Sequence, residues 1–232
     1  MKSLIILGAR QHAKVVFALL QEACADEWKV RGFLDDDPRM QDSELLGVPV
    51  LGPVEKLQDL VARGEVQGAL VGVSCGHMPA RARLFEKIKK FALEAPRVIS
   101  PSAYVHPTAS VGSGSVLCTG AVVNAFATVG ANCVLYSNST VEHECVLEDN
   151  VYIGPGVNFC ADVHVAAGTF IGTGANVICE RVGADVIIGA GAAVVKSVPD
   201  GSVVAGVPAR IIRQRSPEER AQSYALRHSL SI

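Results

Sequence analysis

The stretch from Thr140 to Glu148 holds a histidine between two acids, Glu142, His143 and Glu144. An imidazole titrates near neutral pH, so it can accept a proton from a reacting group. A carboxylate beside it stabilises the protonated ring and fixes which ring nitrogen carries the hydrogen. The pattern therefore predicts a general base, although a solvated surface histidine fits the same residues. The elements that position His143 decide between these interpretations.

The chain around His143 has a period of six residues. Every sixth position from Val105 to Val177 is aliphatic or Phe, and four residues after each of them the chain is usually small or β-branched, as at Cys133 and Cys145. After Val177 one residue is missing, and the period resumes at Val182, Ile188 and Val194. One large and one small interior position in every six residues is the hexapeptide pattern of a parallel β-helix.

Three six-residue sides form a triangular coil of about 18 residues, and successive coils stack at the inter-strand spacing of about 4.8 Å. His143 lies two positions after the interior Val141, so we expect its side chain to point outward at or near a corner. Cys133 and Cys145 fall on interior positions, where a thiol acts as small core filler. The solenoid would thus present His143 to a surface rather than to the core.

The first half of the chain has a different pattern. Apolar strands at 3–7, 30–38 and 68–73 alternate with amphipathic helices that begin near residue 12 and span 79–94. Strands and helices in this order predict a parallel sheet, whose ligands bind beyond the carboxyl ends of the strands. Only Gly8 fits the G-x-G-x-x-G pattern of a dinucleotide site, so a plain strand-to-helix turn explains it equally well.

We therefore expect an α/β domain over residues 1–98, a β-helix domain over 99–213 and a C-terminal tail over 214–232. The conformation of the tail stays open.

Composition excludes several classes. With 21 basic and 23 acidic residues the formal net charge is −2, so no electrostatic footprint for nucleic acid is present. No apolar run reaches about 18 residues and no signal-peptide pattern opens the chain, which favours a cytoplasmic protein without membrane insertion. The seven cysteines include no C-x-x-C pair, which argues against a disulfide framework or a zinc site. Hydrophobic residues make up 49% and aromatic ones 5%, as an aliphatic core requires.

Specific motifs then resemble a known family. They are LGARQHAKVV (7–16), GFLDDDP (32–38), LGVPVLGP (46–53), SPSAYVHPTASVG (100–112), VEHECVLEDNVYIGPG (141–156), IGTGANV (171–177) and VPDGSVVAGVPARII (198–212). Over about residues 2–213 the chain is similar to bacterial sugar-nucleotide amino N-acetyltransferases and sialic acid O-acetyltransferases. These proteins join a small Rossmann-like domain to a left-handed parallel β-helix.

The resemblance implies an acetyl-CoA-dependent N-acetyltransferase that forms a homotrimer and needs no metal. Its acceptor would be the amino group of a nucleotide-linked amino sugar, with a 4-amino-4,6-dideoxy sugar as the leading candidate, and its product would serve surface polysaccharide or glycan synthesis. The resemblance does not name the nucleotide, which stays open between UDP, GDP and dTDP.

Roles of single residues also follow from the resemblance. His143 matches the general base and Glu144 its acidic neighbour. The positions that match substrate contacts are Gly8, Arg10, His12, Asp35 and Asp36. The positions that match acetyl-CoA contacts are Tyr152, Ala161, Thr173 and Ala190.

The chain departs from the family pattern at four positions. Arg10 and Gln11 precede His12 where relatives often have small residues. Tyr136 replaces an Asn seven residues before the base, and Tyr152 replaces a His nine residues after it. These differences leave the acceptor's identity open but retain the base.

Three alternatives follow from the residues. The same His-Glu pair could serve O-acetyl transfer to sialic acid or a similar sugar hydroxyl. A β-helix carbonic anhydrase would need three converging histidines, and His143 and His164 are 21 residues apart, out of phase with the coil. A non-catalytic scaffold would retain the solenoid alone, against which His143 and Glu144 argue weakly.

Overall fold

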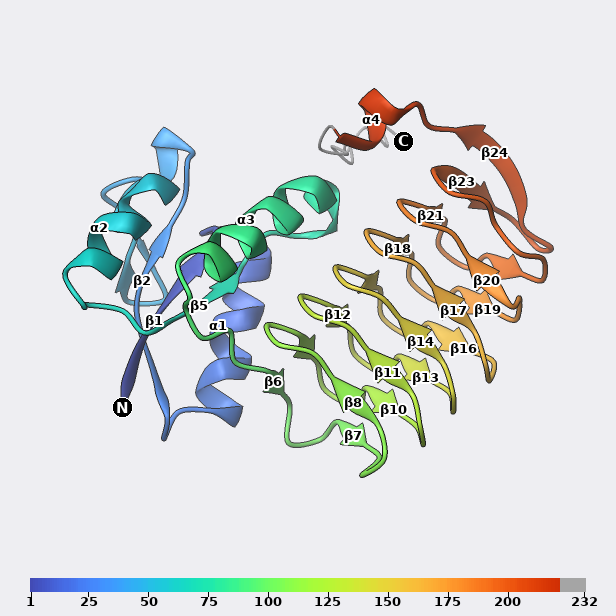
Figure 1. The fold of residues 1–232 in the computed structure, drawn as a ribbon, viewed down its shortest axis with the longest axis horizontal. Helices are drawn as coiled ribbons and strands as arrows, with labels where there is room; N and C mark the ends of the chain where they lie inside the picture. The colour runs from blue at the N-terminus through green and yellow to red at the C-terminus, as the bar shows by residue number, and fades with distance from the viewer. Residues whose placement is uncertain (222–232) are drawn as a thin grey trace.

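The computed structural model describes residues 1–221 and shows a parallel α/β sheet joined to a long β-solenoid (Figure 1). The sheet has the order β2-β1-β5, with β1 (Lys2–Leu7), β2 (Trp28–Leu34) and β5 (Gly68–Val71) all parallel. Its central strand is apolar on both faces because helices cover both. Helix α1 (Gln11–Ala23) packs on one face, while α2 (Leu57–Ala62) and α3 (Met78–Lys90) pack on the other.

The sheet is therefore the one predicted, but two boundaries differ. The second strand was expected to reach residue 38 and instead ends at Leu34, because the Asp35 carboxylate accepts the Asp37 N–H and the chain turns there. Helix α3 ends at Lys90 rather than at residue 94. The remaining short elements of this part are β3 (Glu44–Leu45), β4 (Val48–Pro49) and the 3₁₀ turns η1 (Pro38–Met40), η2 (Val54–Lys56) and η3 (Cys75–His77).

The solenoid has three faces, which the chain visits in turn. Face 1 contains β6 (Val98–Ile99), β9 (Val116–Leu117), β12 (Val134–Leu135), β15 (Tyr152–Ile153), β18 (Phe170–Ile171), β21 (Ile187–Ile188), β23 (Ser202–Ala205) and β24 (Arg210–Gln214). Face 2 contains β7 (Tyr104–Val105), β10 (Val122–Val123), β13 (Thr140–Val141), β16 (Asn158–Phe159), β19 (Asn176–Val177) and β22 (Ala193–Val194). Face 3 contains β8 (Ser110–Val111), β11 (Thr128–Val129), β14 (Val146–Leu147), β17 (His164–Val165) and β20 (Arg181–Val182). We name the turns between them corner 1–2, corner 2–3 and corner 3–1.

The predicted 18-residue coil and the predicted loss of one residue after Val177 are both confirmed. Val122 pairs with Tyr104 and Val141 with Val123, a step of 18 residues from coil to coil. Between β17 and β20 the step shortens to 17, since Val165 pairs with Val182. The missing residue therefore shortens one corner without breaking the stack of parallel strands.

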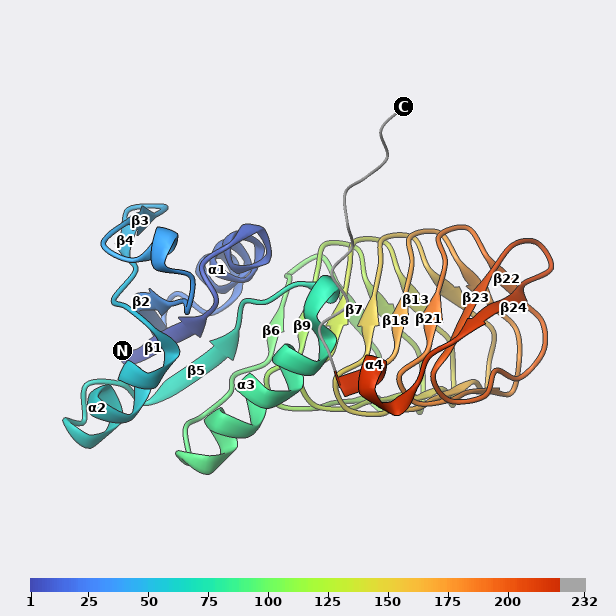
Figure 2. The ribbon, with the colours of Figure 1, turned by 90° about the horizontal axis from the view of Figure 1, so that it is seen from above.

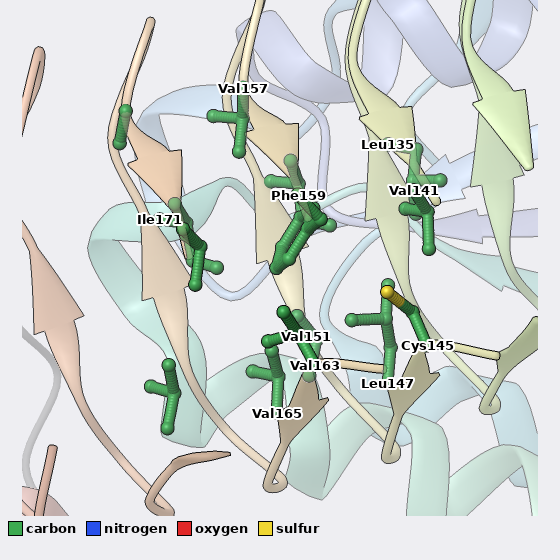
Figure 3. Close-up of a cluster of buried hydrophobic side chains, with 14 of the residues drawn as sticks. Leu135, Val141, Cys145, Leu147, Val151, Val157, Phe159, Val163, Val165 and Ile171 are labelled. Atoms are coloured by element: carbon green, nitrogen blue, oxygen red, sulfur yellow. The ribbon is translucent and has the colours of Figure 1, made fainter. Parts of the chain in front are cut away.

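Inside the coils, the repeating apolar residues form one continuous column (Figure 3). Leu135, Val141, Leu147 and Ile153 have no exposed surface, and neither does Cys145. Burial raises the pKa of the Cys145 thiol, which keeps it protonated and inert. The expectation that cysteine serves as small filler on this column is confirmed.

The corners turn tightly, and this explains their composition. Asn132, Asn138 and Asn150 adopt left-handed backbone angles, with φ between 53° and 58°. Asparagine tolerates this conformation because its short polar side chain can bond locally. Residues other than Gly, Asn and Asp at the same positions therefore indicate strain.

The α/β part packs directly on face 1. Val116, Val134 and Tyr152, which point outward from that face, share one apolar cluster with residues of β1, β2 and α1. Figures 1 and 2 both show α3 lying beside the strands of face 1. At the far end, β24 returns antiparallel to β23 and leads to the short helix α4 (Pro217–Ala221).

The structure describes α4 of the predicted tail, and residues 222–232 lie outside the described part. No helix among residues 1–221 is both long and apolar enough to cross a membrane.

Candidate active site

An open groove of about 510 Å³ lies at corner 2–3. Three successive coils line it: His106 from the first, Asn124, Ala125 and Phe126 from the second, and Glu142, His143 and Glu144 from the third. These residues stack because their positions are one coil apart. The solenoid thus places His143 outward at a corner, as predicted, and gives it a hollow wide enough for a substrate.

His143 and Glu144 are close but not hydrogen-bonded. The His143 Nδ1 lies 3.6 Å from Oε2 of Glu144, and both side chains are more than half exposed. That separation supports electrostatic stabilisation of an imidazolium. The other acid, Glu142, accepts the His143 backbone N–H through Oε2 at 3.3 Å. Glu144 therefore faces the ring and Glu142 faces the main chain, so the two acids have different local roles.

The groove also contains two strained residues. Phe126 and Glu144 occupy the same corner position in successive coils, and both have left-handed backbone angles, with φ of 62° and 60°. This conformation is rare for residues other than Gly, Asn and Asp, and it costs about 1–2 kcal/mol per residue. The phenyl ring of Phe126 is also 63% exposed. Sequence periodicity did not single out Phe126, because its phase is that of an ordinary corner.

The predicted acceptor residues gather beyond the carboxyl ends of β1 and β2. Gly8 has φ of 107°, and a Cβ there would approach the Gly72 backbone carbon to 3.1 Å, so the turn accepts only glycine without strain. Asp35 accepts the backbone N–H groups of Ala9 and Asp37, at 2.7 and 2.9 Å. Asp36 accepts the N–H of Val54 at 2.8 Å. These carboxylates hold three loops together.

Arg10 lies on the exposed side of this turn and forms an ion pair with Asp37. Arg39 binds the same carboxylate, and the hydrogen bonds from Arg39 hold the pKa of Asp37 well below its usual range. Arg10 is 62% exposed, so its guanidinium can still reach a ligand. The structure places Arg10 next to Gly8 and Asp35, as the sequence predicted, while its role stays a prediction.

His12 and Tyr152, by contrast, lie in the layer between the two parts of the chain. His12 is in the first turn of α1, is 2% exposed, and its Nδ1 lies 2.9 Å from the Tyr136 hydroxyl. Tyr152 is 4% exposed and packs against His12, Tyr136 and Phe170. Its expected contact with acetyl-CoA stays a prediction, and the packing gives it a second role in joining the two parts.

Burial lowers the pKa of His12 to about 3, with a smaller contribution from the positive charge of Arg81. His12 is therefore neutral at physiological pH. Its Nε2 has no hydrogen-bond partner among the described atoms.

The other predicted acetyl-CoA residues lie on two different corners. Ala161 stands one coil beyond His143 at corner 2–3, where the Asp162 N–H donates to the His143 carbonyl at 3.1 Å. Thr173 and Ala190 are exposed at corner 1–2, in the coils that contain β18 and β21. A Cβ on Gly172 would meet the Ala190 backbone N at 2.6 Å, so the backbones of adjacent coils are close there. Within one chain, face 2 separates these two groups.

His164 has a separate environment on face 3. Its Nε2 lies 2.7 Å from Glu148 Oε1 and its Nδ1 lies 3.0 Å from Arg181, so the ring donates to the carboxylate and accepts from the guanidinium. Among residues 1–221, no three His, Cys, Asp or Glu side chains are grouped so that they could hold a metal ion. The structure thus does not bring His143 and His164 together.

Comparisons with known proteins connect both parts of the chain to one architecture. Residues 3–88 match the PglD N-terminal domain, and residues 126–160 match the bacterial transferase hexapeptide repeat. The acetyltransferase domain of PglB from Neisseria gonorrhoeae, solved with acetyl coenzyme A, is 33% identical; the match covers 91% of this chain and 99% of that one, with a TM-score of 0.82.

A mutant of GDP-perosamine N-acetyltransferase from Caulobacter crescentus, solved with CoA and GDP-perosamine, is 32% identical over 92% of this chain and 98% of that one, with a TM-score of 0.84. WeeI from Acinetobacter baumannii is 26% identical over 91% of this chain and 100% of that one, with a TM-score of 0.78. These matches confirm the predicted fold class, a small Rossmann-like sheet followed by a left-handed parallel β-helix.

Proposed function

The chain belongs to the family of bacterial sugar acetyltransferases that join a PglD-type N-terminal domain to a hexapeptide-repeat β-helix, and we propose that it N-acetylates a nucleotide-linked amino sugar. It is an acetyl-CoA-dependent acyltransferase, and acetyl-CoA is its co-substrate. We further propose that residues 1–98 bind the sugar nucleotide and that residues 99–213 carry the acyl-transfer site.

One observation carries the proposal: His143 projects into an open groove with an acid beside its ring. In the reaction the acceptor amine attacks the thioester carbonyl, so a C–N bond forms and the C–S bond breaks. The attacking nitrogen becomes acidic and must lose a proton. Because Nδ1 of His143 faces Glu144, Nε2 is free to receive that proton, and the leaving thiolate takes one to become the CoA thiol. General base help of this kind contributes about 10²–10⁴-fold.

Glu144 stabilises the imidazolium after it forms, and Glu142 keeps the backbone of the corner in place. Much of the remaining rate enhancement comes from holding two substrates in one orientation. At the other site, Asp35 and Asp36 fix the loops beyond β1 and β2, while Gly8 and Arg10 present backbone and charge to the acceptor's diphosphate. A guanidinium suits that task because its planar fork matches phosphate oxygens.

The positions of these residues support a composite site and a homotrimer. Tyr136, which contacts His12 of α1, lies at corner 1–2, as do Thr173 and Ala190, whereas His143 and Ala161 lie at corner 2–3. Because one face of the solenoid separates these corners, an acceptor held at corner 1–2 reaches a base at corner 2–3 most directly on a neighbouring copy. Acetyl-CoA would then lie between two solenoids, in contact with Ala161 of one and with Thr173 and Ala190 of the other.

The acceptor is an amine rather than a hydroxyl in this proposal, because a relative over nearly the whole chain is a GDP-perosamine N-acetyltransferase. A 4-amino-4,6-dideoxy sugar is the leading acceptor, and its acetylated product would feed surface polysaccharide or glycan synthesis. We place the reaction in the cytoplasm, where acetyl-CoA and nucleotide sugars are made.

The test is a free-thiol release assay with acetyl-CoA and a panel of UDP-, GDP- and dTDP-linked amino sugars. Acetylation of at least one of them, confirmed by a mass increase of the sugar nucleotide, is the expected result. Acetylation of free sialic acid with no turnover of any sugar nucleotide would contradict the proposal and favour O-acetyl transfer.

A further inference from the structure

Helix α3 lies along corner 3–1 with about one helical turn for each coil of the solenoid. Phe85 faces Gly114, where an added Cβ would approach Phe85 Cε2 to 2.7 Å. Arg81 contacts Asn132 one coil further, and the carbonyl of Met78 accepts a hydrogen bond from Asn150 Nδ2 at 3.2 Å in the coil after that. A helical turn rises about 5.4 Å and a coil about 4.8 Å, so the two repeats match over this distance.

Arg81 is the centre of this contact and is 1% exposed. Its guanidinium donates to the carbonyl of Val73 in the N-terminal domain. It also donates to the backbone oxygen and to Oδ1 of Asn132 in the solenoid, at 3.0 and 3.2 Å. The Asn132 side chain in turn donates to Oδ1 of Asn150 at 2.9 Å. Arg81 therefore connects the two domains through one side chain.

This cation is buried without a carboxylate partner among the described residues. Burial lowers the pKa of Arg81 from its ordinary value. Its Nε has no hydrogen-bond partner among the described atoms. Burying a charge costs several kcal/mol unless bonds compensate, and an apolar side chain would fill the same space at lower cost. Packing alone therefore does not explain an arginine here.

The contacts of Arg81 continue to the turn after β1, which contains Gly8 and Arg10 and which we call the acceptor-binding turn. Its guanidinium carbon lies 5.3 Å from the centre of the Tyr152 ring. That ring is 5.6 Å from the His12 imidazole, centre to centre, and His12 follows Gly8 in the turn after β1. A displacement of α3 against the solenoid would therefore move the acceptor-binding turn.

We propose that Arg81 is a positioning residue for acetyl transfer: one guanidinium nitrogen binds Val73 and the other binds Asn132, which fixes the height of the N-terminal domain along the solenoid, and with it the position of the bound acceptor. The inference rests on the proposed function. A misplacement of about 1 Å between reacting groups can cost about 10²-fold in rate. A slip of one coil would move the acceptor by about 4.8 Å, and the bonds of Arg81 to one asparagine prevent it.

The experiment compares Arg81→Lys with Arg83→Lys, its matched control on the exposed side of α3. Both are assayed for acetylation of the sugar nucleotide that the wild type turns over best, at a temperature where circular dichroism shows both variants folded. We expect kcat of Arg81→Lys to fall by about 10–100-fold with the KM values for both substrates within about threefold. A lysine keeps the charge, but its single nitrogen cannot replace the two guanidinium nitrogens that bind Val73 and Asn132.

A second variant changes the solenoid side of the contact between Arg81 and Asn132. Asn132→Gly retains the left-handed backbone, whose φ is 53°, and removes the Oδ1 acceptor. If Arg81 acts through Asn132, the double variant loses little more kcat than Arg81→Lys alone.

Equal kcat for Arg81→Lys and Arg83→Lys would overturn the inference, as would strictly additive losses in the double variant. Both outcomes leave the proposed function intact, because the wild type is active in them. Wild-type protein inactive toward the whole panel would instead contradict the proposed function, and with it this inference.

Discussion

The Nδ1 of His12 lies 2.9 Å from the hydroxyl of Tyr136, and this contact joins the turn after β1 to corner 1–2 of the solenoid. His12 comes from the first turn of α1, and Tyr136 directly follows β12. The contact brings a residue predicted to serve the acceptor to the corner that also contains Thr173 and Ala190. It also buries an imidazole, and this has consequences for stability.

Stability should depend on pH through His12. Burial lowers the pKa of His12 to about 3 in the folded chain, whereas in the unfolded chain it is about 6.5. Between these values the unfolded state binds a proton that the folded state does not, so the free energy of unfolding falls as the pH decreases. From pH 7 to pH 5 this loss is about 2 kcal/mol.

Urea unfolding of the wild type and of His12→Gln at the two pH values measures this contribution. The variant should lose about 2 kcal/mol less than the wild type over the same interval. Equal pH dependence of both proteins would show that His12 is not held neutral by burial.

The backbone strain at corner 2–3 predicts a trade of stability against activity. Phe126→Asn should raise the free energy of unfolding by about 1 kcal/mol, since asparagine adopts the left-handed conformation at lower cost. The same change removes an exposed ring from the groove of His143 and should raise the KM for acetyl-CoA. Leu46→Asn is the control, because its backbone is also left-handed, with φ of 56°, but lies between β3 and β4, away from both corners; it should raise stability without changing the KM for acetyl-CoA. A destabilised Phe126→Asn with unchanged kinetics would contradict this interpretation.

The two acids beside His143 should differ in their effect on turnover. Glu144→Gln removes the charge that faces the ring and should lower kcat by about tenfold, because a nearby carboxylate stabilises the imidazolium that forms during the reaction. Glu142→Gln is the matched control, since that carboxylate bonds the backbone N–H of His143 instead. A larger loss of kcat in the Glu142 variant would show that Glu142, rather than Glu144, stabilises the protonated ring.

Much of the solenoid could be predicted because its repeat is visible in the residue type at every sixth position. The apolar phase from Val105 to Val177 located the strands of all three faces, and the deletion before Val182 predicted the shortened coil that the structure contains. The outward position of His143 followed from its distance to Val141. The antiparallel return of β24 was not predicted, because Arg210–Gln214 is exposed throughout and lacks the apolar period.

The contacts between domains were the part that sequence could not supply. A helix with five basic residues between Arg81 and Lys90 predicts a solvated face, and nothing in the sequence distinguishes the buried Arg81 from the exposed Arg83. The burial of His12 and Tyr152 depends on the same packing. The distribution of predicted residues over two corners also needed coordinates, since it depends on which face the N-terminal domain covers.

The central claim is that His143 is the general base, and its most direct test is the turnover of His143→Asn. This change keeps a polar side chain at an exposed position, so the variant should fold with wild-type stability. With acetyl-CoA and the best sugar nucleotide of the panel, we expect kcat to fall by about 10²–10⁴-fold, with acceptor binding unchanged by thermal shift. A folded His143→Asn variant that turns over at the wild-type rate would contradict the account.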